Sequence, residues 1–210
     1  MNMIDIVENF RSLSWVNIDC GFRQGQDAIL NHLQHQFDQF HEDESYSVSQ
    51  LIFAMQKSIE DLAKLIQPYQ IPEDYKNFLE YYGGLAIDGI DCDFSVLGIG
   101  PMAETWYGYI NSGDNILLES KKMGWLMIGQ LVFRRDHKYK NKRVLFYLDL
   151  VGSVQKNCII AIGPWNGIDP EESKVFEKIH DYSALWTKSA DSFKEWLKLA
   201  GETRGAFTYV

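Results

Sequence analysis

Hydrophobic residues in the first third of the chain recur at the spacing of amphipathic helices. Within residues 1–40 the apolar positions follow steps of three and four, which predicts a mostly helical region. Residues 51–66 repeat this pattern. Ser47 or Ser49 can cap the second helix by accepting hydrogen bonds from its free N–H groups. Pro68 ends that helix, because proline lacks a backbone donor and clashes with the preceding turn.

A third, shorter helix is predicted to begin at Pro72. Proline is favourable in the first turn, where its missing N–H group has no helical partner anyway. The acidic side chains of Glu73 and Asp74 complement the positive end of the helix. Gly83 and Gly84 end it, since glycine adopts the left-handed conformation of a C-cap most easily.

Beyond Leu85 the pattern changes to short runs of β-branched and aromatic residues separated by glycines and polar turns. These runs predict strands at Phe94–Ile99, Trp125–Ile128, Leu131–Phe133, Val144–Leu150 and Cys158–Ile162. Helical spacing returns at Ser189–Leu199. Helices followed by a strand-rich centre and a final helix indicate an α+β fold and not a parallel βαβ sheet.

Length and composition support one large unit with an extension. The chain has 210 residues, of which 46% are hydrophobic, enough for a sizeable core. The polar stretch 41–50 leads us to expect an N-terminal helical extension at 1–45 and an α+β domain at 46–210. No apolar run approaches the roughly 20 residues of a helical membrane span, and the N-terminus lacks signal-peptide features. We therefore expect a cytoplasmic protein with no membrane contact.

Charge is distributed unevenly along the chain. The net charge of −9 disfavours binding to phosphate backbones. Residues 73–104 carry a net charge of −6, whereas residues 121–143 carry +7. The basic segment 134–143 is interpreted as a solvated loop that protects sheet edges, with a nucleic-acid patch as the alternative. We predict no nucleic-acid partner, because the molecule as a whole is acidic.

The sequence shows no convincing catalytic or metal-binding pattern. The acidic run 88–93 lacks the spacing and the closing glutamate of a calcium loop. A catalytic pair of carboxylates, as in glycosidases, stays an alternative, although 29 acids offer many chance pairs. The sequence comes nearest to a zinc site at His32, His35 and His41, but these histidines lack the ligand spacing of zinc sites. Three widely spaced cysteines are interpreted as buried structural thiols: Cys20, Cys92 and Cys158. We predict no catalytic residue, metal or cofactor.

Two sets of residues are candidates for a protein interface. Tight interfaces combine aromatic anchors with a charged rim. The acids that could form the rim are Asp88, Asp91, Asp93 and Glu104. The aromatic residues that could anchor a partner are Trp106, Tyr107 and Trp165. A core position is the alternative for these aromatic side chains, since most tryptophans are largely buried.

Residues 71–84 read IPEDYKNFLEYYGG and resemble the signature of the SUKH superfamily. This superfamily includes fungal cell-wall assembly regulators and many bacterial toxin-immunity proteins. Tyr82 departs from the pattern, because asparagine often stands there in the family. Three further segments resemble family elements in the same order: the Ile-Gly strand at 126–129, the strand ending in Asp-Leu at 144–150, and the closing helix at 190–197.

The resemblance covers roughly residues 50–200 and implies a twisted sheet, mixed or antiparallel, that is flanked by helices. It also implies a non-catalytic role, in which the protein binds a cognate toxin domain and blocks it. The acidic stretch 73–104 would then face a basic toxin domain, such as a nuclease. No contact residue is carried over, because contacts in the family vary with the toxin. Two alternatives stay open: a scaffold or regulatory interaction protein with a SUKH-like domain, and an unrecognised hydrolase.

Overall fold

The computed structural model of the chain describes residues 3–36, 47–100, 124–134, 143–163 and 186–205. The helices are α1 (Met3–Arg11), the short 3₁₀ helix η1 (Phe22–Gln24), α2 (Gln26–Gln36), α3 (Val48–Leu65), α4 (Glu73–Tyr82) and α8 (Phe193–Glu202). The strands are β1 (Val16–Ile18), β2 (Leu85–Asp88), β3 (Cys92–Val96), β4 (Trp125–Phe133), β5 (Arg143–Asp149), β6 (Ile159–Ile162) and β7 (Trp186–Ala190).

All seven described strands belong to one antiparallel sheet. Each strand pairs with the next one along the chain, so the order across the sheet is β1 to β7. Antiparallel neighbours can be joined by short hairpins and need no crossover helix. The predicted α+β fold, a sheet flanked by helices with a helical N-terminal segment, is therefore confirmed.

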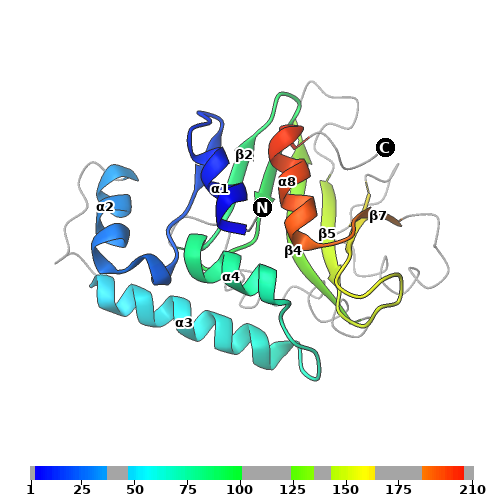
Figure 1. Ribbon diagram of the computed structural model, residues 1–210, viewed down its shortest axis with the longest axis horizontal. Helices are drawn as coiled ribbons and strands as arrows, with labels where there is room; N and C mark the ends of the chain where they lie inside the picture. The colour runs from blue at the N-terminus through cyan, green and yellow to red at the C-terminus, as the bar shows by residue number, and fades with distance from the viewer. Residues whose placement is uncertain (1–2, 37–46, 101–123, 135–142, 164–185, 206–210) are drawn as a thin grey trace.

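Helices α1, α4 and α8 lie over one face of this sheet (Figure 1). Trp196 of α8 packs against Phe94 of β3 and Phe146 of β5, with ring centroids 5.0 Å apart in both pairs. Phe193, one turn earlier, lies 4.9 Å from the ring of Tyr75 in α4. These fully buried rings join α4, α8 and the sheet into one core. Helices α2 and α3 lie on the side of the molecule away from β7.

The ends of α3 and α4 follow the sequence rules closely. The Ser47 hydroxyl accepts a hydrogen bond from Gln50 N while the Gln50 side chain accepts one from Ser47 N, a reciprocal capping box. Pro72 occupies the N-cap of α4, and Gly83 ends it with a φ of 67°. Within the described residues, no helix combines the length and apolar character needed to cross a membrane.

The N-terminal segment contributes to the same sheet and core as the rest of the chain. Strand β1 pairs with β2 along Val16–Ile18. Helix α1 contacts α4 and α8, and its inward face is buried: Met3, Ile6, Val7 and Phe10. The boundary predicted near residue 45 falls in a part of the chain outside the described residues.

The strand predictions were incomplete. Strands β1, β2 and β7 lie where the sequence predicted none; β1 has only three residues inside a region with helical spacing. The two strands predicted at 125–128 and 131–133 form the single strand β4, whose register shifts between Met127 and Gly129. This bulge inserts a residue without ending the strand. Ser189 belongs to β7, so the last helix begins later than predicted, at Phe193.

Candidate protein-binding site

Glycines bring the end of α4 against the segment that follows β3. Gly83 O accepts a hydrogen bond from Gly100 N at 3.0 Å. A Cβ atom on Gly98 would lie 1.7 Å from the same carbonyl oxygen, a distance that no side chain permits. The glycine stop of α4 and the Gly98-Ile-Gly100 turn are therefore two halves of one close backbone contact.

A second glycine, Gly129 in β4, lies directly beneath Trp196. A Cβ atom there would be 2.9 Å from Trp196 Cη2 and 2.5 Å from Ser95 O. The Ile-Gly step at 128–129 thus leaves room for the indole that fastens α8 to the sheet. The requirement for glycine here is therefore steric.

Two acids in these segments are held by backbone N–H groups. Asp149, at the end of β5, is fully buried and accepts hydrogen bonds from Gly152 N (2.8 Å), Val154 N (2.7 Å) and Gln155 N (3.2 Å). Asp74 accepts from Lys194 N at 3.3 Å and thereby joins the beginnings of α4 and α8. Burial raises the pKa of Asp74, an effect that its hydrogen bonds with backbone N–H groups partly offset. Both acids therefore hold segments of the fold together through hydrogen bonds with backbone N–H groups.

The hairpin between β2 and β3 has the opposite character. Asp88 and Asp93 lie directly across from one another, and their side chains are 63% and 60% exposed. Ile90, at the tip between them, is 73% exposed, and Asp91 beside it is also exposed. We call Asp88, Ile90, Asp91 and Asp93 the acidic hairpin. Like charges directly opposite on antiparallel strands repel each other, so this pair is unfavourable for the isolated fold.

One cation compensates for this repulsion. The guanidinium group of Arg134 contacts Asp88 and lies 2.6 Å from Asp93 Oδ1. Its backbone N–H group donates to Asp91 O at 2.9 Å, which fixes the residue beside the hairpin. Arg204 supports the other side: its Nε donates to Asp88 O at 3.1 Å, and its guanidinium lies 5.1 Å from the centre of the Trp15 ring.

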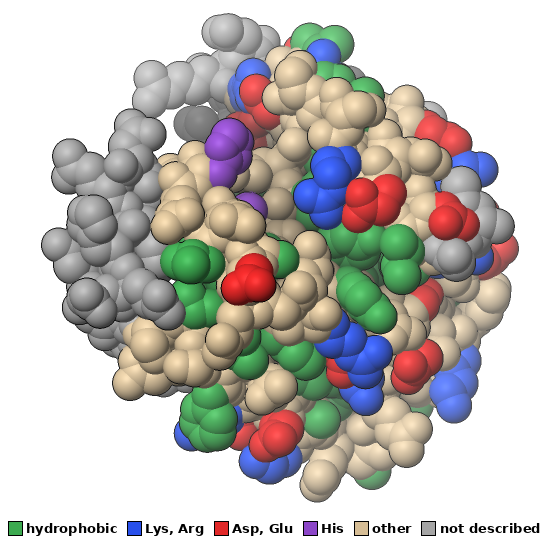
Figure 2. Space-filling view, turned by 60° about the vertical axis from the view of Figure 1, so that its left-hand side comes forward, with side chains coloured by type: hydrophobic (Ala, Val, Ile, Leu, Met, Phe, Trp, Pro, Cys, Tyr) green, Lys and Arg blue, Asp and Glu red, His purple; other side chains and the backbone are tan. Residues whose placement is uncertain are grey.

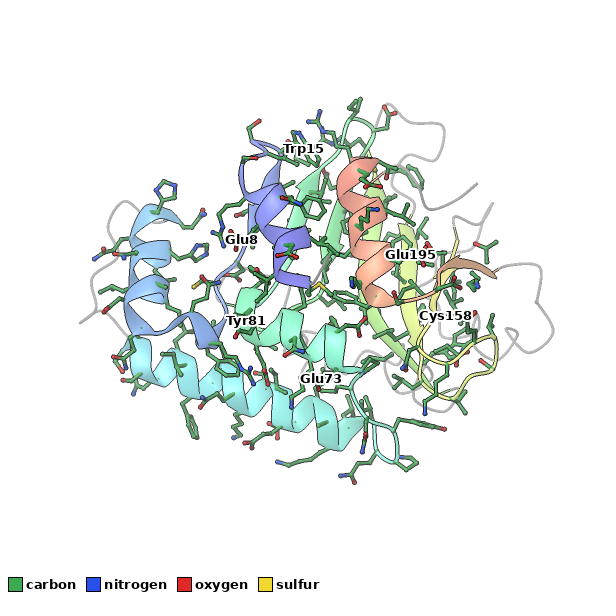
Figure 3. The ribbon with its side chains drawn as sticks, viewed as in Figure 1. Glu8, Trp15, Glu73, Tyr81, Cys158 and Glu195 are labelled. Carbon is green, nitrogen blue, oxygen red and sulfur yellow. The ribbon has the colours of Figure 1, made fainter. Side chains whose placement is uncertain are left out.

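The remaining acids of segment 73–104 that the structure describes lie elsewhere. Glu73 begins α4, at the opposite end of the molecule from Trp15, which adjoins the hairpin (Figure 3). Glu80 is buried and lies 2.7 Å from Arg23 and 3.8 Å from Lys76. The predicted acidic surface is therefore not continuous. Its exposed described part is the acidic hairpin, together with Glu73 at a distance.

The structure brings together three of the seven predicted interface residues, Asp88, Asp91 and Asp93. The other four lie outside the described residues: Glu104, Trp106, Tyr107 and Trp165. Sequence reasoning missed Ile90 and the part played by Arg134. An apolar residue inside an acidic Gly-containing turn was a usable signal for Ile90. The pairing of Arg134 with acids more than forty positions away required the strand register.

A cavity of about 330 Å³ adjoins the hairpin on the sheet face that points away from Trp196. Cross-strand neighbours form its floor: Ala86, Ser95 and Gln130 in one row, and Asp88, Asp93 and Val132 in the next. Asn17 pairs with Ala86 and continues the first row, and the buried Asp19 lies beyond it, away from the hairpin. The cavity is thus lined by oxygen-bearing side chains and a few small apolar ones.

A larger groove of about 1170 Å³ runs along α3 and α4. Its lining includes Phe22, Ile59 and Ile71 together with Glu60, Glu73 and Lys76. Figure 2 brings this side of the molecule forward and shows hydrophobic side chains surrounded by charged ones. The groove contains only one of the predicted acids that are exposed, Glu73.

A histidine and a cysteine, residue types that many enzymes use in catalysis, lie beside Asp19. His32 Nε2 lies 3.0 Å from Asp19 Oδ1, a pairing that could orient an imidazole. Burial, reinforced by the charge of Asp19, raises the pKa of the neighbouring Cys20 thiol to about 11. A thiol with so high a pKa stays protonated near neutral pH and is a poor nucleophile. Within the described residues, no group of three potential metal ligands was found.

The chain belongs to the SMI1/KNR4 family, also called SUKH-1. The model of that family matches residues 54–199, which confirms the resemblance drawn from the sequence. The match includes α4, the sheet from β2 to β7 and most of α8. Membership in this family is consistent with a protein-interaction module. No curated protein and no solved structure matched the chain significantly.

Proposed function

We propose that this protein is a non-catalytic immunity protein that binds a toxin domain in the cytoplasm and blocks it. The observation that carries the proposal is an exposed apolar side chain inside acidic neighbours, on a member of the SUKH-1 family. Ile90 would be the apolar anchor, and Asp88, Asp91 and Asp93 the surrounding charge. Interfaces of this kind draw their binding energy from a few desolvated anchors, while surrounding groups exclude water.

The charge of the hairpin favours a basic partner, such as a nuclease toxin. Complementary charges accelerate encounter, and their effect falls as salt screens them. Glu104, Trp106, Tyr107 and Trp165 remain proposed contributors to the same interface. A scaffold or regulatory interaction protein is the second candidate, since the matched family model alone does not distinguish a toxin partner from another protein. A toxin gene directly beside the gene for this chain would favour immunity.

Co-expression with the C-terminal domain of a neighbouring toxin gene tests the proposal. Growth should be rescued by this chain, and the two proteins should elute together in gel filtration. Failure of both rescue and co-elution would overturn the immunity role. Co-elution without rescue would instead favour the scaffold or regulatory role.

Two matched substitutions locate the contact. Ile90→Asp should weaken the complex at least about tenfold, because a charge at the centre of an interface must be desolvated. Phe53→Asp is the control, since Phe53 is 66% exposed on α3, outside the acidic hairpin. It should leave affinity unchanged. Equal losses from the two variants would remove the hairpin from the interface.

A further inference from the structure

We infer that the cavity beside the acidic hairpin is a recognition pocket for a basic side chain, foremost an arginine, of the protein partner. This inference rests on the proposed function and deepens it by naming the chemistry of the partner's contact. It concerns the cavity of about 330 Å³ on the sheet face opposite α8.

The lining of the pocket matches a long cationic side chain. Asp88 and Asp93 lie along one row of its floor, and the buried Asp19 lies at the far end, where its Oδ1 accepts a hydrogen bond from Cys20 N and lies 3.0 Å from His32 Nε2. Asn17 and Ser95 add polar side chains between them, and the Gln130 side-chain oxygen accepts a hydrogen bond from Arg143 Nη1 at 3.5 Å. Ala86 and Val132 supply short apolar surfaces against which an aliphatic stem can pack. A volume of this size lies at the small end of the range for ligand pockets, about 300–1,000 Å³.

The chain itself shows which group the rim of the pocket accepts. Arg134 Nε lies 3.1 Å from Asp93 Oδ1, and its Nη2 contacts both Asp93 and Asp88. One guanidinium therefore already bridges the two opposed carboxylates. Guanidinium groups suit this role because several N–H donors lie in one plane and keep their charge at any physiological pH.

Arg134 is at the same time an internal competitor. Its side chain is 41% exposed, so exchange with an incoming cation does not require the core to open. An arginine of the partner that enters from solvent would share or replace its contacts with Asp88 and Asp93. Removal of Arg134 would leave the carboxylates without this bridge and increase their attraction for an external cation.

Arginine amide is a direct probe, because its carboxylate is blocked and its charge is positive. Titration into the ¹⁵N-labelled full chain should give saturable shifts of the amides of Ala86, Ser95 and Gln130, with a Kd on the order of millimolar for so small a ligand. Citrulline amide, which replaces the guanidinium by a neutral urea, is the matched ligand control and should give no saturable shift. Equal binding of both ligands, or of neither, would overturn the inference.

Three variants test the assignment within the chain. The double variant Asp88→Asn/Asp93→Asn should weaken arginine amide at least about tenfold, whereas Arg134→Gln should strengthen it. Asp61→Asn removes a partly exposed acid of α3 that lies outside both the pocket and the acidic hairpin, and should leave the affinity unchanged. An equal loss in Asp61→Asn would indicate general electrostatic attraction and overturn the pocket. Should the double variant not fold, the single variants Asp93→Asn and Arg134→Gln test the inference. It requires that Asp93→Asn lowers the affinity for arginine amide and that Arg134→Gln raises it.

The outcome is distinguishable from that of the proposed function. Selective binding of arginine amide without rescue from a toxin would leave the pocket in place and remove the immunity role. Rescue that survives the loss of Asp88 and Asp93 would keep the immunity role and remove the pocket from its mechanism.

Discussion

The acids of this protein occupy two regions with opposite surroundings. Asp149 is buried and Asp74 is half-buried, and each is held by backbone N–H groups at the ends of strands and helices. Asp88 and Asp93 face each other on an exposed hairpin with Arg134 between them. The first region uses charge to join elements of the fold. The second presents charge to solvent at a cost to the fold, which is the arrangement expected of a binding surface.

The residues of the family signature differ from those of the candidate binding surface. The segments that identify the SUKH-1 family contain Gly83, Gly129, Asp149 and Trp196, whose described contacts all lie within the core and its turns. The acidic hairpin lies between these segments. The family signature therefore consists of residues that build the core and its turns, and the acidic hairpin lies outside the segments that carry the signature.

The largest loss of stability is expected at the close backbone contact between Gly98 and Gly83. Gly98→Ala would place a Cβ atom 1.7 Å from Gly83 O, and the three nearest atoms all belong to the backbone of Gly83 and Gly84. We expect a loss of about 3 kcal/mol or more in the free energy of unfolding, measured by urea denaturation. Gly25→Ala is the control: its φ of 90° is unfavourable for alanine, but no atom lies within 4 Å of the added Cβ. A smaller loss for Gly98→Ala than for Gly25→Ala would contradict this account of the glycine contact.

The contrast between the two kinds of acid is tested by equivalent substitutions. Asp149→Asn leaves only one acceptor oxygen for three N–H donors and places an NH₂ group against them. We expect a loss of about 2–3 kcal/mol in urea denaturation. Asp91→Asn on the hairpin should change stability by less than about 0.5 kcal/mol. Similar losses from both substitutions would remove the distinction drawn between the regions.

The buried thiol of Cys92, on the inward side of the hairpin, should make the stability of the protein depend on pH in the alkaline range. Burial, reinforced by Asp93 and Asp91, raises the pKa of the Cys92 thiol from 9.0 to about 11. Between these values the unfolded chain releases the proton while the folded chain keeps it. Stability should therefore fall as pH rises from about 9 to 11. Cys92→Ala should make the stability profile less steep in this window, as followed by urea denaturation. An unchanged slope would show that the thiol does not contribute.

A small effect on stability is expected at Arg134, where the ion pairs are exposed. Arg134→Gln leaves Asp88 and Asp93 opposed without their cation, and should reduce stability by less than about 1 kcal/mol because the groups are exposed. The difference from the unmodified protein should shrink in 1 M salt, which screens charges beyond about 3 Å. Asp88→Asn in the Arg134→Gln background should recover part of the loss. A loss that is independent of both salt and Asp88 would place the role of Arg134 elsewhere.

The sequence alone predicted the helices at 51–66 and 72–82, their caps, the α+β class and the family. These properties depend on residues that are close in the sequence, or on motifs that follow one another in a fixed order. A capping serine, a proline in the first turn and apolar spacing each act within a few residues. The three missed strands illustrate the limit of such signals. β1 is short and gains its stability from pairing with β2, a partner nearly seventy positions later in the chain.

Only the tertiary structure decided which acids act together. The sequence grouped Glu73, Glu80 and Asp88 into one acidic stretch, whereas the fold buries Glu80 against Arg23 and separates Glu73 from the hairpin. Strand register set Asp88 opposite Asp93, and the end of β4 brought Arg134 to both. Register and long-range pairing depend on the packing of the whole sheet, so neighbouring residues in the sequence carry no record of them.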